Sequence, residues 1–176
     1  MDRHIDDYLG RAIWFNWAKL GCYSPLTDSW STTTTTDAPT ARYRHTAVWT
    51  GSKMTVWGGY GTSFSDENTG GIYDPSNNTW TSTTTDLAPA PHNHHTAVWT
   101  GSKMIVWGGS DSTITLNSGA IYDRANDSWS ATPSTDAPSA RWLHSAFWTG
   151  TKMLIWGGAT AAAAPSDINT GSLYAP

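Results

Sequence analysis

Short runs of apolar residues alternate with polar turn segments along this chain, and one arrangement of them occurs three times. Each copy has two apolar runs joined by the sequence Thr-Gly-Ser/Thr-Lys, and each copy ends in a pair of glycines. The copies span residues 45–59, 95–109 and 144–158. Their closing tryptophans, Trp57, Trp107 and Trp156, are 50 and 49 residues apart, a period that is typical of repeat folds.

A second segment also occurs three times, with a tyrosine and a tryptophan seven positions apart. It spans residues 23–30, 73–80 and 122–129, with asparagine or aspartate in its second half. Because these are turn-forming residues, the segment predicts a strand, a tight turn and another strand. A Ser/Thr-rich stretch ending in Ala-Pro follows each copy. Since proline cannot donate to a sheet ladder, these stretches predict connections between units.

One complete unit therefore contains four predicted strands, near residues 45–50, 53–57, 71–74 and 79–82. The first strand places Ala47 and Trp49 on one face and Val48 on the other, so neither face is strongly polar. That pattern indicates a sheet covered on both sides. The glycine pair after the second strand predicts positive φ angles or the close approach of another backbone segment.

Residues 1–20 lie outside the repeat. Ile5, Leu9, Ile13 and Trp17 recur every four positions, which predicts a short amphipathic helix. The alternative is a leader without stable structure, because short isolated helices are marginal. We divide the remaining chain into a partial unit, two full units and a second partial unit, at residues 21–40, 41–90, 91–139 and 140–176.

Composition narrows the classes of function. The net charge is −4 and the ten Lys and Arg residues are dispersed, so the basic patch of a nucleic-acid-binding protein is absent. Nine of the twelve tryptophans occupy repeat-equivalent positions, which indicates packing rather than a ligand site. The single cysteine, Cys22, excludes an internal disulfide. No signal peptide or membrane-spanning run is recognisable, so we expect a soluble protein that does not engage membranes, in an undetermined compartment.

The glycine pairs followed by a tyrosine and then a tryptophan, at a period of about fifty residues, resemble the kelch repeat. The resemblance covers residues 21–176 and implies an all-β chain of four-stranded antiparallel blades around a central channel, in a family whose members are often exported. The positions that carry it are Gly58, Gly59, Tyr73, Trp80, Gly108, Gly109, Tyr122, Trp129, Gly157, Gly158 and Tyr174.

Counting strands over the repeat gives thirteen, which is three blades and one surplus strand. Closed propellers have roughly four to eight blades, so three blades form an open arc with an apolar face at each end. Two copies could close a six-bladed ring by two-fold symmetry, with the Trp30 strand completing the blade that ends at Tyr174. Alternatively the chain is part of a longer propeller. We favour the open arc or fragment for the isolated chain.

The loops between the second and third strands differ most between the copies, and they share one face with the connections between blades. They span residues 60–69, 110–118 and 159–170. Loops on a rigid scaffold carry function, although neutral drift would produce the same variation. The resemblance places two sets of residues at the mouth of the channel, each set consisting of one equivalent position from every copy. The first set is Arg42, His92 and Arg141, and the second set is His45, His95 and His144. Recurrence of the second set favours a repeated hydrogen bond between blades over a ligand site.

Residues 92–95, His-Asn-His-His, depart from the repeat, and on an extended strand His92 and His94 share one face while His95 points away. Since no Cys or acidic partner is close in sequence, we assign no metal site and no cofactor. Loop carboxylates that could form an acid/base pair are Asp66, Glu67, Asp111 and Asp167, but no complete catalytic set is visible.

The sequence therefore predicts a non-catalytic binding scaffold. Its ligand is a protein or, second, a carbohydrate. The candidate binding face consists of the loops, both channel-mouth sets and the four loop carboxylates. The alternative is a partial propeller from a carbohydrate-active or oxidase-type enzyme.

Overall fold

A computed structural model describes residues 21–160 and 166–176 as strands joined by turns and loops. This part of the chain contains fifteen strands and no helix, so the all-β prediction is confirmed. No helix long and apolar enough to cross a membrane occurs in these residues. The helix or leader expected over residues 1–20 lies outside the described residues.

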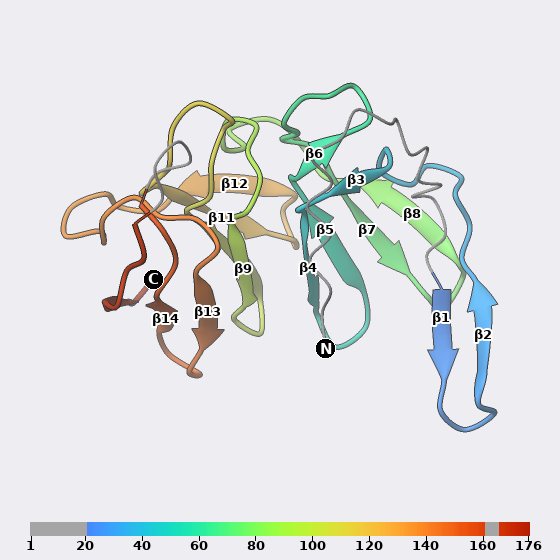
Figure 1. Cartoon of the computed structure of the whole chain (residues 1–176). Helices are drawn as coiled ribbons and strands as arrows, with labels where there is room; N and C mark the ends of the chain where they lie inside the picture. The colour runs from blue at the N-terminus through green and yellow to red at the C-terminus, as the bar shows by residue number, and fades with distance from the viewer. Residues whose placement is uncertain (1–20, 161–165) are drawn as a thin grey trace.

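Three antiparallel sheets follow one another along the chain, each built from strands that pair in sequence order (Figure 1). The first sheet consists of β4 (Thr46–Trp49), β5 (Met54–Trp57), β7 (Gly70–Asp74) and β8 (Thr79–Ser82). The second sheet consists of β9 (Thr96–Trp99), β10 (Lys103–Trp107), β11 (Gly119–Asp123) and β12 (Ser128–Ala131). The third sheet consists of β13 (Ser145–Trp148), β14 (Met153–Trp156) and β15 (Gly171–Tyr174).

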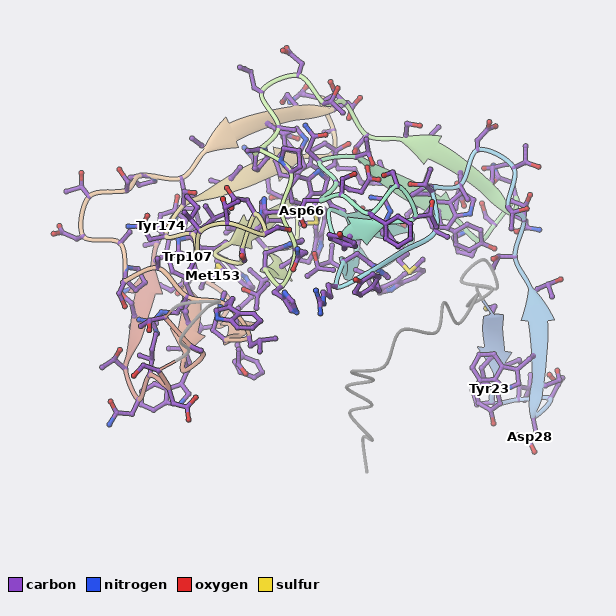
Figure 2. All side chains as sticks on the ribbon, turned by 45° about the horizontal axis from the view of Figure 1, so that its top comes forward. Tyr23, Asp28, Asp66, Trp107, Met153 and Tyr174 are labelled. Atoms are coloured by element: carbon purple, nitrogen blue, oxygen red, sulfur yellow. The ribbon has the colours of Figure 1, made fainter. Side chains whose placement is uncertain are left out.

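Two small strand pairs complete the described structure. A hairpin of β1 (Gly21–Ser24) and β2 (Ser29–Thr32) precedes the first sheet, and Figure 2 shows it standing away from the other strands. The two-residue strands β3 (Arg42–Tyr43) and β6 (Tyr60–Gly61) pair beside the first sheet. The thirteen predicted strands are present, and β3 and β6 are the two that the repeat pattern did not reveal.

The Tyr-to-Trp spacing is explained by the turn between the outer strands. Tyr73 and Trp80 lie opposite one another, and the Tyr73 hydroxyl donates a 2.9 Å hydrogen bond to Asn78 Oδ1. Asn78 has a φ of 56°, a left-handed conformation that asparagine and aspartate tolerate better than other side chains. Tyr122 and Asp127 repeat the contact at 2.6 Å in the second sheet.

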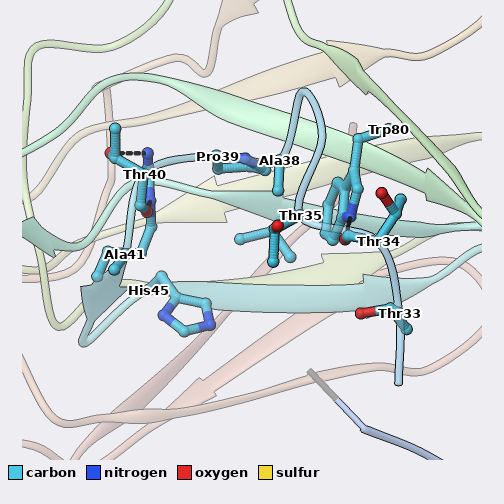
Figure 3. Close-up of a pocket in the computed structure, with 11 residues that line it drawn as sticks. Thr33, Thr34, Thr35, Ala38, Pro39, Thr40, Ala41, His45 and Trp80 are labelled. Carbon is cyan, nitrogen blue, oxygen red and sulfur yellow. Dashed lines mark hydrogen bonds between the residues drawn. The ribbon is translucent and has the colours of Figure 1, made fainter. Parts of the chain in front are cut away.

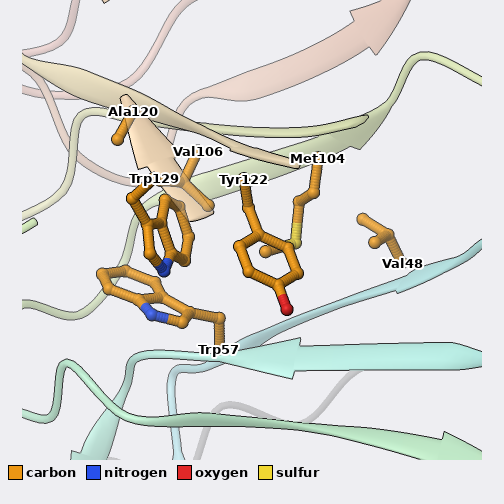
Figure 4. Close-up of a cluster of buried hydrophobic side chains, with 7 residues drawn as sticks. All are labelled: Val48, Trp57, Met104, Val106, Ala120, Tyr122 and Trp129. Carbon is orange, nitrogen blue, oxygen red and sulfur yellow. The ribbon is translucent and has the colours of Figure 1, made fainter. Parts of the chain in front are cut away.

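The sheets pack face to face, with their inner strands β4, β9 and β13 next to one another, as in propeller blades. Figure 4 shows the core between the first and second sheets, where Val48 and Trp57 contact Met104, Tyr122 and Trp129. A second core joins Val98 and Trp107 to Met153 and Ile155 of the third sheet. The two larger clusters therefore lie between blades. The repeated tryptophans Trp57, Trp107 and Trp129 pack in them as the sequence predicts, whereas Trp30, Trp49 and Trp156 are exposed.

Candidate binding face

Arg42 lies beneath the loop face, and its buried guanidinium is saturated by hydrogen bonds from its own blade. Nε donates to the Thr40 carbonyl at 2.9 Å, and Nη1 donates to the carbonyls of Gly58 and Thr69 at 3.1 and 2.8 Å. Nη2 donates to the hydroxyls of Thr40 and Thr69, both at 2.9 Å. All five donors are therefore used to tie the connection into the blade to its second-to-third strand loop.

The other two members of this set are buried as well. Arg141 repeats the arrangement, with bonds to the carbonyls of Ser139, Gly157 and Thr170. His92 replaces the guanidinium in the second blade, where its Nδ1 lies 2.7 Å from the Ala90 carbonyl and burial lowers its pKa. The structure thus places this set within the blades, and the accessible surface at the channel mouth consists of neighbouring residues.

The histidines of the second set join successive blades. His95 Nε2 lies 2.8 Å from Thr46 Oγ1, and His144 Nε2 lies 2.8 Å from Thr96 Oγ1, so the repeated hydrogen bond favoured by the sequence is present at both boundaries. Burial lowers the pKa of His144 to about 4, helped by the positive charge of Arg141, and it also lowers the pKa of His95. Both rings are therefore neutral near pH 7. His45, on the face of the first sheet that no other blade covers in the described residues, is exposed.

The loop carboxylates chiefly hold the loops in shape. Asp66 accepts hydrogen bonds from Asn93 Nδ2 and, at 2.6 Å, from Ser112 Oγ, which links the loops of the first and second blades. Asp111 accepts from the amides of Thr113 and Ile114, and these hydrogen bonds lower its pKa. Glu67 accepts from Thr69 Oγ1 at 3.1 Å, whereas Asp167 is exposed beside Ala159.

The histidines of residues 92–95 do not converge as metal ligands. His94 has a φ of 55°, so the backbone is not extended there and the expected alternation of side chains is wrong. The rings of His92 and His95 are 4.8 Å apart and buried, while His94 contacts Trp142 instead. Within residues 21–160 and 166–176, no three His, Cys, Asp or Glu side chains are grouped so that they could hold a metal ion.

A row of aromatic and cationic side chains crosses the loop face, and we call it the aromatic row. It consists of Tyr60, Tyr43, Arg44, His94 and Trp142. The rings of Tyr43 and Tyr60 are 5.4 Å apart, and Arg44 Cζ lies 4.9 Å from the centre of the Tyr43 ring. The His94 amide donates to the Arg44 carbonyl at 3.3 Å, and the rings of His94 and Trp142 are 4.9 Å apart. The row therefore runs from the first blade to the third.

Exposed apolar side chains and a small cavity lie next to the aromatic row. Phe64, Ile114 and Leu143 are exposed on the loops and connections of the three blades. A cavity of about 110 Å³ is lined by Tyr43, Tyr60 and Phe64 among others. Apolar groups held in water around a cavity are a common feature of protein-binding surfaces.

Sequence reasoning missed the aromatic row, although a signal for it exists. Arg44, His94 and Leu143 are equivalent and precede the unchanged histidines, yet they differ in every copy. All three have left-handed backbones, with φ between 55° and 58°. Such conformations are uncommon for arginine and leucine, and strained residues concentrate at functional sites. A position that differs between the copies, next to a position that is unchanged, identifies a side chain that the repeated fold does not require.

Comparison with known proteins identifies the repeat. The model of the KLHDC2/KLHL20/DRC7 Kelch-repeats domain matches residues 16–171 of the chain. No curated protein matches it.

Proposed function

Because the chain belongs to the kelch-repeat family, we propose that it is a binding scaffold whose aromatic row receives a protein partner. Kelch-repeat domains are commonly protein-interaction scaffolds and are generally non-catalytic. The observation that carries the proposal is the partly exposed row from Tyr60 to Trp142, whose two halves are linked by the backbone hydrogen bond between His94 and Arg44. Tyrosine, tryptophan and arginine are the residue types that most often dominate the binding energy of protein interfaces.

The surroundings of the row define the chemistry of the partner. The cavity between Tyr43, Tyr60 and Phe64 suits one apolar side chain. Arg44 is exposed beside it, and its guanidinium suits a carboxylate of the partner. We therefore propose a peptide segment with an apolar residue next to an acidic one. The residues of the two channel-mouth sets support this face from beneath, with His45 exposed at its edge.

Selection from a random peptide library on the immobilised full chain tests this proposal. We expect the selected peptides to combine an apolar and an acidic residue, and Trp142→Ala to weaken their binding by about 2 kcal/mol, roughly thirty-fold. Lys152→Ala is the matched control, because Lys152 is exposed on a link between strands and lies outside the aromatic row. Peptides that bind the Trp142→Ala variant as well as the unchanged chain would contradict the proposal.

Carbohydrate is the second candidate ligand, because aromatic rings on a rigid surface can also stack against the apolar faces of sugars. A glycan array probed with the same two variants separates the candidates. Binding of glycans but not peptides, lost in Trp142→Ala, favours carbohydrate.

We also propose a specific blade division and assembly for this scaffold. Blades at residues 41–90 and 91–139 are complete, and partial blades lie at 21–40 and 140–176. Two copies then close a six-bladed ring, within the usual range of roughly four to eight blades. The support for this assembly is that the first and third sheets each leave one apolar face uncovered in the described residues.

A further inference from the structure

Each internal boundary between blades is built around one tryptophan. Trp57, at the end of β5, is fully buried against the second sheet. The centre of its ring system lies 5.2 Å from that of Trp129, 5.0 Å from His92 and 5.2 Å from His95. Trp107 repeats this role at the next boundary, 5.3 Å from His144. A boundary therefore needs a tryptophan from one blade and a receiving site on the next.

A vacant receiving site lies on the free face of the first sheet. Trp80, Arg42 and His45 are the equivalents of Trp129, His92 and His95, and they line a cavity of about 300 Å³ (Figure 3). Val56 and Ala38 also line it, so the cavity is both apolar and bordered by an imidazole. In the described residues no tryptophan of a preceding blade occupies it.

The matching tryptophan is exposed at the other end of the arc. Trp156 is 56% exposed, whereas its equivalents Trp57 and Trp107 are 0% and 4% exposed. Phe147 is also exposed, although the equivalent Val48 and Val98 are buried between sheets. The third sheet thus exposes the tryptophan half of a boundary, and the first sheet exposes the cavity that such a tryptophan would fill.

The polar groups at the two ends belong to the same hydrogen-bond pairs. Gly59 and Gly109 donate their amides to the carbonyls of His92 and Arg141 at 3.0 and 2.9 Å. Gly158 is equivalent to Gly59 and Gly109, and its amide has no such acceptor among the described residues. The carbonyl of Arg42, at the other end of the arc, is equivalent to the acceptor carbonyls of His92 and Arg141.

The side chains repeat this match. Ser145 is equivalent to Thr46 and Thr96, the hydroxyl partners of His95 and His144. It is exposed at one end of the arc, and His45 is exposed at the other.

We propose that a second copy of this chain covers both free faces, with Trp156 of each copy filling the cavity beside Trp80 and His45 of the other. Two such contacts related by a two-fold axis close six blades into a ring. The proposal deepens the assembly named under the proposed function. It does not depend on what the aromatic row binds.

A second contact follows from the missing outer strand of the third sheet. Trp80 and Trp129 donate Nε1–H to the carbonyls of Thr34 and Thr84, both at 3.2 Å. At the corresponding place on the third sheet lies a cavity of about 130 Å³. Its lining includes Trp107, Pro133, Ala137, Ile155 and Tyr174.

Trp30 of the second copy suits this cavity. It is 72% exposed and lies opposite Tyr23, as Trp80 lies opposite Tyr73. In the ring, β15 takes the place of β1 beside β2 of the second copy, so the β1–β2 hairpin opens and β1 becomes the surplus strand.

Light scattering on the full chain across a concentration series tests whether two copies associate through these two contacts. We expect twice the monomer mass of 19.1 kDa. Trp156→Ala removes the inserted tryptophan and Ala41→Phe fills the cavity, so each should weaken association by at least about ten-fold. Trp30→Ala should weaken it through the second cavity. Leu87→Ala, which truncates an exposed side chain outside both faces, should leave the mass unchanged.

Three results would overturn the proposal. They are a monomer at all concentrations, a mass that keeps rising beyond two copies, or a dimer that survives both Trp156→Ala and Ala41→Phe. A monomer would point to further blades of a longer chain as the cover of these faces. Trp142→Ala separates this test from that of the proposed function, because it should weaken peptide binding roughly thirty-fold and leave the dimer intact.

Discussion

Arg141 is a charged residue whose side chain stabilises the blade in which it is buried. It is 1% exposed, and its guanidinium binds the connection into the third blade and the loop between β14 and β15. The planar fork of five donors fits the carbonyl of Ser139 in the connection together with those of Gly157 and Thr170, which lie at the two ends of the loop. In the second blade, His92 keeps the contact with the connection through the Ala90 carbonyl, as Arg141 does through that of Ser139.

Replacement of Arg141 by lysine should therefore destabilise the protein although the charge is kept. A lysine ammonium cannot reproduce the fork, and it leaves buried carbonyls without donors, so we expect a loss of about 2–3 kcal/mol. Urea unfolding measures the loss. Arg44→Lys is the control, because Arg44 is exposed and should change stability by no more than about 0.5 kcal/mol. Equal losses in the two variants would show that the fork of Arg141 is not important.

His144 should make the stability of the protein depend on pH. Its pKa is about 4 in the folded state because of burial and of Arg141, compared with about 6.5 for a histidine in an unfolded chain. Above pH 6.5 the ring is neutral in both states. Between pH 6.5 and 4 the unfolded chain binds a proton that the folded chain does not, so the free energy of unfolding falls as the pH falls.

Urea unfolding at several pH values checks this expectation. His144→Gln keeps an amide group that can form a hydrogen bond with Thr96 and cannot titrate, so its stability should fall less steeply between pH 6.5 and 4 than that of the unchanged chain. His95, whose pKa is also lowered, accounts for part of the remaining slope. Identical slopes with and without His144 would refute the assignment.

At the scale of the strands, the sequence pattern predicts most of what the structure shows. The outer hairpins were readable because Asn78 and Asp127 adopt left-handed turns that few other residues accept. The glycine pairs were readable for the same reason. Gly58 has a φ of 68°, and a Cβ added there would lie 2.6 Å from His95 Cε1. A backbone conformation that only a few residue types can adopt can therefore be predicted from the sequence.

The short strands and the aromatic row were harder to predict from the sequence. β3 and β6 have two residues each, too few to show an alternation of apolar and polar positions. Arg44 and Leu143 adopt left-handed backbones that their residue types disfavour, so propensity predicts the opposite. The burial of Arg42 and Arg141 also escaped prediction, because their partners are backbone carbonyls, which every residue type supplies.

At the scale of the whole molecule, the blades are open at both ends. The aromatic row crosses three blades, so its geometry depends on boundaries that contain His95 and His144. Closure by a second copy would fix the two outer blades in the same way. Assembly and ligand binding would then support one another, because the rigid ring holds the row in its binding geometry.

Gly157 provides a selective test of this closure. Its φ is 72°, similar to that of Gly58 and Gly108, but an added Cβ would meet nothing closer than the Ile168 carbonyl at 3.6 Å. At Gly58 and Gly108 the same Cβ would lie 2.6 Å from a histidine ring of the next blade. Gly157→Ala should thus cost a monomer only the backbone strain of about 1–2 kcal/mol. In the ring it should also clash with His45 of the second copy.

Sedimentation equilibrium on Gly157→Ala measures the second effect, with Gly51→Ala as the matched control. Gly51 also has a positive φ, at 93°, and open space around it, but it lies on a link between strands and away from the boundaries. The two variants should lose similar stability as monomers, while only Gly157→Ala should dissociate the dimer. If both variants dimerise as tightly as the unchanged chain, His45 does not sit against Gly157 of a second copy, and the ring must close by another contact or not at all.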